Sequence, residues 1–292
     1  MILPPDILAK IDSCQILARR VVEGLPLPGI HRSTRTGESV EFHQYRNYMQ
    51  GDDLRHLDWR LLARSDTLAI RTQTPDSPMR VGIVVDASAS MAYRGESSPC
   101  SKFKLASILA AALAYIAMGQ GDEVSLHVYQ DGLLPGSGIH TGLAEFCHSL
   151  EEVEPAGEGR ADAALARCSE QVAGRGVAFW ISDFLDGEDA LGRRLRGLSA
   201  RAQGVTAFQI LDPDERSFPF SSARRFLDPE DSRRRVDAFP EQSRQEYLER
   251  FGAHQELVRG ICLREETRFE SLDFSDDLAG SLARAITVPN IV

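Results

Sequence analysis

Apolar and polar residues follow one another in a regular order along residues 79–288. Five short runs rich in valine, isoleucine and phenylalanine predict strands, at residues 80–86, 123–130, 177–184, 205–212 and 267–274. Apolar residues at helical spacing predict helices between them, at residues 102–119, 142–150, 161–172, 190–202 and 241–265. Strands separated by helices predict right-handed βαβ units. The expected fold class is therefore α/β, with a mostly parallel sheet flanked by helices on both faces.

The first 78 residues have a different pattern of apolar and polar residues. Apolar residues recur at helical spacing over residues 7–22, which predicts an amphipathic helix. The stretch that follows is dense in arginine and glycine and predicts a small β-rich extension, with short strands at residues 39–42 and 67–73. The chain is therefore expected to comprise an N-terminal helix plus an Arg/Asp-rich β extension, residues 1–78, and a larger domain, residues 79–288.

Charge and composition narrow the range of partners and the compartment. The formal net charge is −10, and residues 1–71 carry +1, so the larger domain is acidic and a nucleic-acid partner is not expected. The chain start lacks the basic and continuous apolar regions of a secretory signal, and the five cysteines include no C-x-x-C pair. The longest apolar stretch, residues 105–118, is shorter than the roughly 20 residues of a membrane span. We expect a cytoplasmic protein without membrane insertion.

The sequence D-A-S-A-S directly follows the first predicted strand of the larger domain. Asp86, Ser88 and Ser90 alternate there, and Asp183 lies near the end of a second predicted strand, residues 177–184. The carboxyl ends of parallel strands are where α/β proteins bind ligands. Carboxylate and hydroxyl oxygens suit a hard divalent cation, so we expect a metal site for Mg²⁺, or for Mn²⁺ or Ca²⁺, formed by these four residues. The same residue types also cap helices and bond loop backbone, and this structural role stays open.

These motifs resemble a known family. D-x-S-x-S after an apolar strand, with a later strand that ends in S-D, resembles the metal-ion-dependent adhesion site of von Willebrand A domains. The segment GIHRSTRTGESVEFHQYRNYMQGDDLRHLDWRLLAR, residues 29–64, resembles the signature of bacterial domain-of-unknown-function family 58. That resemblance implies a von Willebrand A-like (Rossmann-like) fold and a non-enzymatic protein-binding role. It also implies a MoxR-type AAA+ ATPase as partner, in chaperone-like assembly or activation of a client protein.

One position departs from the adhesion-site pattern. The family places a threonine in the loop before a later helix, and the corresponding loop here reads G-E-G-R-A-D, with Ala161 in the threonine's place. A methyl group cannot coordinate a cation, and the neighbouring Arg160 would repel one. Any metal is therefore expected to bind more weakly than in a complete site.

The sequence leaves two alternatives to the protein-binding module open. One is a Mg²⁺-dependent hydrolase or phosphotransferase with Asp86 as nucleophile, although Ser88 stands where such enzymes need a second carboxylate. The sequence contains no G-x-S-x-G, H-E-x-x-H or phosphate-loop motif, so no enzyme is expected. The other is a metal-free structural scaffold that binds through the arginine-rich extension, although its Arg46 and Arg55 are more typical of ion pairs that fasten the extension to the larger domain.

Overall fold

The computed structural model describes residues 44–47, 69–72, 78–185, 187–221, 224–227, 235–238 and 240–276, together with 280 and 282. The chain divides into two compact units: the smaller is Ala18–Pro78, and the larger contains Met79–Val292. Within the smaller unit, β1 (Gln44–Asn47) pairs with β2 (Ala69–Thr72) in antiparallel register. The helix expected at residues 7–22 and the strand expected at residues 39–42 lie outside the described residues. The expected domain limits, 1–78 and 79–288, stay predictions.

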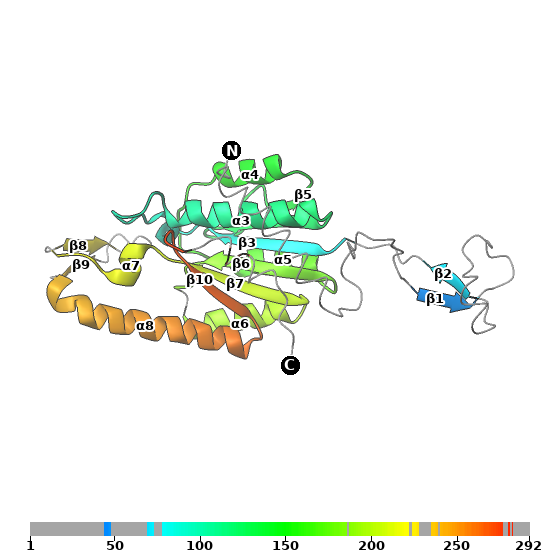
Figure 1. Cartoon of the computed structure of the whole chain (residues 1–292). Coiled ribbons are helices and arrows are strands. Elements are labelled where there is room, and N and C mark those ends of the chain that lie inside the picture. Colours follow the sequence, from blue (N-terminus) through cyan, green and yellow to red (C-terminus); the bar gives the residue numbers. More distant parts are fainter. Residues whose placement is uncertain are drawn as a thin grey trace. The chain divides into compact units, whose positions relative to one another are not determined.

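A six-stranded sheet forms the centre of the larger unit (Figure 1). Its order is β10-β7-β6-β3-β4-β5, and every pairing is parallel except that of β4 with β5. The strands are β3 (Arg80–Asp86), β4 (Glu123–Tyr129), β5 (Gly138–His140), β6 (Gly176–Ser182), β7 (Gly204–Ile210) and β10 (Arg268–Leu272). The predicted α/β class with a mostly parallel sheet is confirmed. The short antiparallel strand β5 was not predicted.

Helices cover both faces of this sheet. The helices that follow β3 in the chain are η2 (Ala89–Ala92), α3 (Lys102–Gly119), α4 (Leu143–Glu151), α5 (Asp162–Val172), α6 (Glu188–Ser199), α7 (Pro213–Ser217) and α8 (Pro240–Arg264). Alternate residues of β3 face opposite sides: Ile83 packs in one apolar core with α3 and α4, and Val84 packs in another with α5, α6 and α8. This alternation explains why β3 reads as a continuous apolar run. A third pairing, β8 (Arg224–Leu227) with β9 (Arg235–Ala238), is antiparallel and precedes α8 in the chain.

Helix α3 is the most apolar helix among the described residues. The hydroxyl of Ser101 caps its start by accepting from the backbone N–H of Lys104. Its length and composition would suffice to cross a membrane, but most of it is buried against the sheet and α4. That burial is typical of a core helix, which needs apolar residues on all sides.

A buried histidine on β4 predicts acid sensitivity. His127 is 0% exposed, and burial lowers its pKa from 6.5 to about 4. In the unfolded chain His127 binds a proton below about pH 6.5, whereas in the folded chain it binds one only below about pH 4. The neutral imidazole therefore contributes fully to stability at neutral pH, and this contribution is lost as the pH falls from 6.5 to 4. The shift corresponds to about 3 kcal/mol.

Urea unfolding of the wild type and of His127→Gln at neutral and acidic pH tests this prediction. The free energy of unfolding of the wild type should fall relative to that of the variant by up to about 3 kcal/mol between pH 6.5 and pH 4. His148→Gln is the matched control, because the side chain of His148 is 70% exposed. A difference between wild type and His127→Gln that does not change with pH would contradict it.

Candidate functional site

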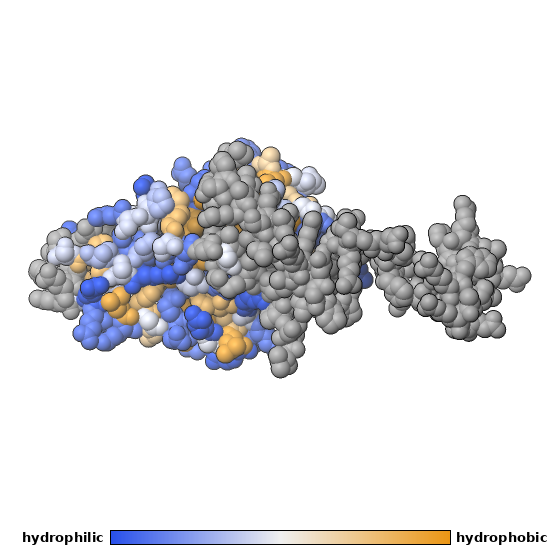
Figure 2. Space-filling model, viewed as in Figure 1, coloured by the Kyte–Doolittle hydropathy of each residue, from blue (hydrophilic) through white to orange (hydrophobic). Residues whose placement is uncertain are grey.

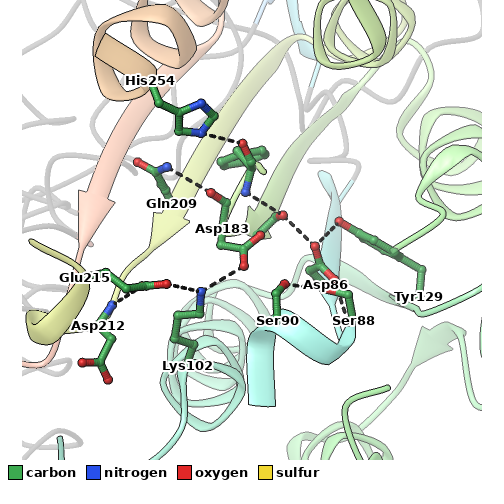
Figure 3. A network of polar contacts seen from close by, with 12 residues as sticks. Asp86, Ser88, Ser90, Lys102, Tyr129, Asp183, Gln209, Asp212, Glu215 and His254 are labelled. Atoms are coloured by element: carbon green, nitrogen blue, oxygen red, sulfur yellow. Dashed lines mark hydrogen bonds and ion pairs between the residues drawn. The ribbon is translucent and has the colours of Figure 1, made fainter. Parts of the chain in front are cut away.

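Two strand ends bring the predicted site residues together. Strands β3 and β6 are neighbours in parallel register, with Val85 opposite Ile181, so Asp86 and the Ser182–Asp183 pair emerge at the same edge of the sheet (Figure 3). Ser88 and Ser90 follow in the turn of η2, and their hydroxyls lie 3.0 Å apart. All four predicted residues, Asp86, Ser88, Ser90 and Asp183, are buried. The site is therefore closed by the loops around it.

Three hydrogen bonds hold the carboxylate of Asp86. Its Oδ1 accepts from the backbone N–H of Ser88 at 2.8 Å, and its Oδ2 accepts from the hydroxyls of Ser182 at 2.7 Å and Tyr129 at 2.9 Å. Burial, and secondarily the charge of Asp183, raise the pKa of Asp86 from 3.8 to about 6 in spite of these donors. Burial thus destabilises the charged form of Asp86, while the three hydrogen bonds fix the orientation of its carboxylate.

A chain of buried polar groups, which the sequence analysis missed, supports Asp86. Trp180 on β6 donates its indole N–H to the hydroxyl of Tyr129 at 3.0 Å, and Tyr129 in turn donates to Asp86. Tyr129 ends β4 and Asp86 ends β3, and the two are register partners. The signal for this contact was present in the sequence, since Tyr129 ends the strand next to D-A-S-A-S.

The backbone after Asp183 is strained. Phe184 has φ of 53°, in the left-handed region that bulky residues avoid. Its N–H donates to Ser182 Oγ at 3.1 Å, and its carbonyl accepts from His254 of α8 at 3.0 Å. Phe184 also packs edge-on against Trp180 at 5.0 Å between ring centroids. Strain of this kind, about 1–3 kcal/mol, persists where surrounding contacts hold it, and it clusters at functional sites.

The loop before α5 closes over Ser88. Its Gly157 and Gly159 have φ of 81° and 73°, and the carbonyl of Gly157 accepts from the N–H of Ala89 at 3.1 Å. A Cβ atom on Gly159 would lie 3.2 Å from that of Ser88, and one on Gly157 would meet the carboxylate of Asp131. The two glycines therefore permit the close approach of this loop to the D-A-S-A-S turn.

Ala161 lies at the start of α5 and is fully buried. It follows Gly159, which approaches Ser88, so the residue that replaces the family threonine lies at the same edge as the other site residues. Its side chain offers no oxygen. The guanidinium of the preceding Arg160 is exposed and pairs with Glu158 at 2.8 Å. Arg160 is therefore neutralised on the surface, and the missing ligand at Ala161 is the main departure of this loop.

A buried lysine, also missed from the sequence, contacts Asp183. Lys102 is the first residue of α3, and its side chain is 1% exposed. Its Nζ donates to Asp183 Oδ2 at 3.0 Å and to Glu215 Oε1 at 2.9 Å (Figure 3). Burial alone would lower the pKa of Lys102, but the two carboxylates outweigh it and raise the pKa above its usual value. The ammonium is therefore charged and bridges the sheet edge to α7.

Helix α7 is tied to the loop that follows η2. Asp212 caps the helix by accepting from the N–H of Asp214, and Glu215 returns the bond to the N–H of Asp212, which completes a capping box. The other oxygen of Asp212 accepts from the N–H of Gly95 at 2.8 Å and from the hydroxyl of Ser98 at 2.6 Å. Glu215 thus links this cap to Lys102, and the whole edge is one network.

The predicted metal site at this edge lacks one expected ligand, and several of its carboxylate oxygens have partners within the chain. Both oxygens of Asp86 accept hydrogen bonds within the chain, Asp183 is paired with Lys102, and Ala161 supplies no ligand. Among the described residues, no group of three or more His, Cys, Asp or Glu side chains could hold a metal ion. The donors that remain for a cation are the hydroxyls of Ser88 and Ser90 and shared carboxylate oxygens.

Comparisons with known proteins extend the resemblance over most of the chain. A family model described as "Protein of unknown function DUF58" matches residues 44–257. The chain is 28% identical over 221 residues to the uncharacterized protein Rv1480 of Mycobacterium tuberculosis, which covers 74% of this chain and 68% of that protein. Two solved structures are also similar to this chain. The conserved hypothetical protein BatB from Bacteroides thetaiotaomicron has a TM-score of 0.51 at 13% identity, over 72% of this chain and 97% of that chain. The SpRpn10 VWA domain has a TM-score of 0.44 at 10% identity, over 74% and 100%.

Proposed function

Because the chain belongs to the family described as protein of unknown function DUF58 and has the von Willebrand A-like α/β fold, we propose that it is a non-enzymatic protein-binding module. Its binding face would be the edge at which β3, β4 and β6 end. The structure of that edge is the observation that supports this proposal most. Its polar side chains are buried and held in place, while the loops above them carry exposed side chains; the buried residues are Asp86, Ser88, Ser90 and Asp183.

Apolar side chains on these loops supply surface for a partner. Tyr93 follows β3 and is 37% exposed, Leu133 follows β4 and is 37% exposed, and Leu185 follows β6 and is 62% exposed. On the face drawn in Figure 2, hydrophilic residues surround smaller apolar areas. Exposed apolar residues in loops that a rigid sheet positions are typical of binding faces. We therefore assign the partner contact to these loops, with the buried carboxylates beneath them as support.

A reaction at Asp86 has less support. A nucleophilic carboxylate needs a free oxygen, whereas both oxygens of Asp86 accept hydrogen bonds and the residue is 5% exposed. Ser88 stands where a second carboxylate would act. If the chain were a phosphotransferase, the purified protein would hydrolyse a generic phosphate ester, and Asp86→Asn would abolish that turnover.

The family resemblance names the partner class. We propose a MoxR-type AAA+ ATPase, with a client protein that the pair assembles or activates in the cytoplasm. Binding of Mg²⁺, Mn²⁺ or Ca²⁺ by Asp86, Ser88, Ser90 and Asp183 would be weak, because Ala161 replaces a ligand and Lys102 competes for Asp183. The contact with the ATPase would then depend mainly on the loops.

Isothermal titration calorimetry with a purified MoxR-type ATPase tests the proposal. Leu185→Asp should weaken binding at least about ten-fold, because it places a charge in an apolar contact; that factor equals about 1.4 kcal/mol. Leu263→Asp is the matched control: Leu263 is 79% exposed but lies at the end of α8, just before β10 begins, at the opposite edge of the sheet. No binding by the wild type, or equal losses in both variants, would overturn the proposal.

A further inference from the structure

The position of Lys102 is unfavourable in two respects. It begins α3, where the helix dipole disfavours a positive charge, and it is 1% exposed, although lysine is rarely buried. An apolar residue would pack here at lower cost unless the charge itself were needed. The two carboxylates within 3.0 Å of its Nζ, Asp183 and Glu215, show what the charge balances.

Asp183 is also one of the two predicted carboxylate ligands for a cation at this edge. It stands at the end of β6 beside Asp86, close enough that its charge raises the pKa of Asp86. Two neighbouring carboxylates repel each other unless a cation lies beside them. In this chain the cation beside Asp183 is an ammonium covalently attached to α3.

We propose that Lys102 is the residue that sets the ion preference of this edge: its tethered ammonium takes the place of a divalent cation and keeps the affinity for such ions low. The inference does not depend on a protein partner. It predicts that the edge binds divalent cations better once the ammonium is removed, because Asp183 and Glu215 then lack their counter-charge. A merely structural lysine predicts destabilisation without any gain in ion binding.

The test is calorimetric titration of chelator-stripped wild type and Lys102→Met with Mg²⁺, Mn²⁺ and Ca²⁺, together with thermal unfolding in each ion. Lys102→Met should bind at least one of the ions about ten-fold more tightly than the wild type does. The same ion should raise the unfolding temperature of the variant more than that of the wild type, at equal ionic strength. Lys102→Arg, which keeps the charge, should show no gain.

Further variants locate the ion and protect the test against misfolding. The gain should disappear in Lys102→Met/Asp183→Asn, which lacks both charges. If Lys102→Met does not fold, Lys102→Met/Glu215→Gln leaves only Asp183 uncompensated and should show the same gain. Divalent affinity equal to or lower than that of the wild type in the folded variants would overturn the inference. Failure of the ATPase titration would not, since no partner is present in this experiment.

Discussion

Replacing Lys102 by methionine is expected to lower the free energy of unfolding by about 3–5 kcal/mol in the absence of divalent ions. The loss follows from what remains: Asp183 is 3% exposed and would keep a buried charge without its partner, and Glu215 would lose its bond as well. Removal of one member of a buried ion pair costs more than the pair contributes, because the other charge stays desolvated. Urea unfolding followed by tryptophan fluorescence measures the change.

The control for this variant is two residues away. Lys104→Met removes an equal charge from the same turn of α3, but Lys104 is exposed, so its loss should change stability by less than about 0.5 kcal/mol. Equal effects of the two substitutions would mean that the contacts of Lys102 with Asp183 and Glu215 contribute nothing specific. That result would remove the basis of the charge balance described for this edge.

Asp212→Ala is expected to cost about 3 kcal/mol. Loss of the helix cap contributes about 1 kcal/mol, and the donors left without an acceptor, the Gly95 N–H and the Ser98 hydroxyl, contribute the rest. Asp212 is 0% exposed, so water cannot replace the lost acceptor. The midpoint of urea unfolding reports the change.

Asp189→Ala is the matched control for Asp212→Ala. Asp189 lies in the first turn of another helix, α6, but it is exposed, and its interaction with the helix dipole contributes at most about 1 kcal/mol. A loss for Asp212→Ala no larger than that of Asp189→Ala would show that α7 is not held by this cap. The link from Glu215 to the sheet edge would then lose its support.

The sequence predicts well what depends on local pattern. Apolar runs located β3 and β6, and the rule that parallel strands end at one edge correctly brought Asp86 near Asp183. The short strand β5 was missed because three residues that include Gly138 have no measurable period. Helix α7 was not predicted, although the D-P-D-E run that begins at Asp212 carries the signature of a capping box.

The contacts that complete the candidate site depend on tertiary structure. Lys102 is separated along the sequence from Asp183 by 81 residues and from Glu215 by 113. No local sequence pattern predicts contacts between residues so far apart. A lysine at a helix start reads as a solvated charge, which is its common role. The burial of Asp86 was likewise not predicted, since it results from the loop of Gly157 and Gly159 closing over the turn.

Hydrogen exchange of the complex with a MoxR-type ATPase shows whether the loop edge of the sheet is the binding face. We expect slower exchange on binding in the loops that follow β3, β4 and β6, around Tyr93, Leu133 and Leu185, with no change near Leu263 at the end of α8. Protection confined to residues 18–78, or to the opposite edge of the sheet, would contradict it.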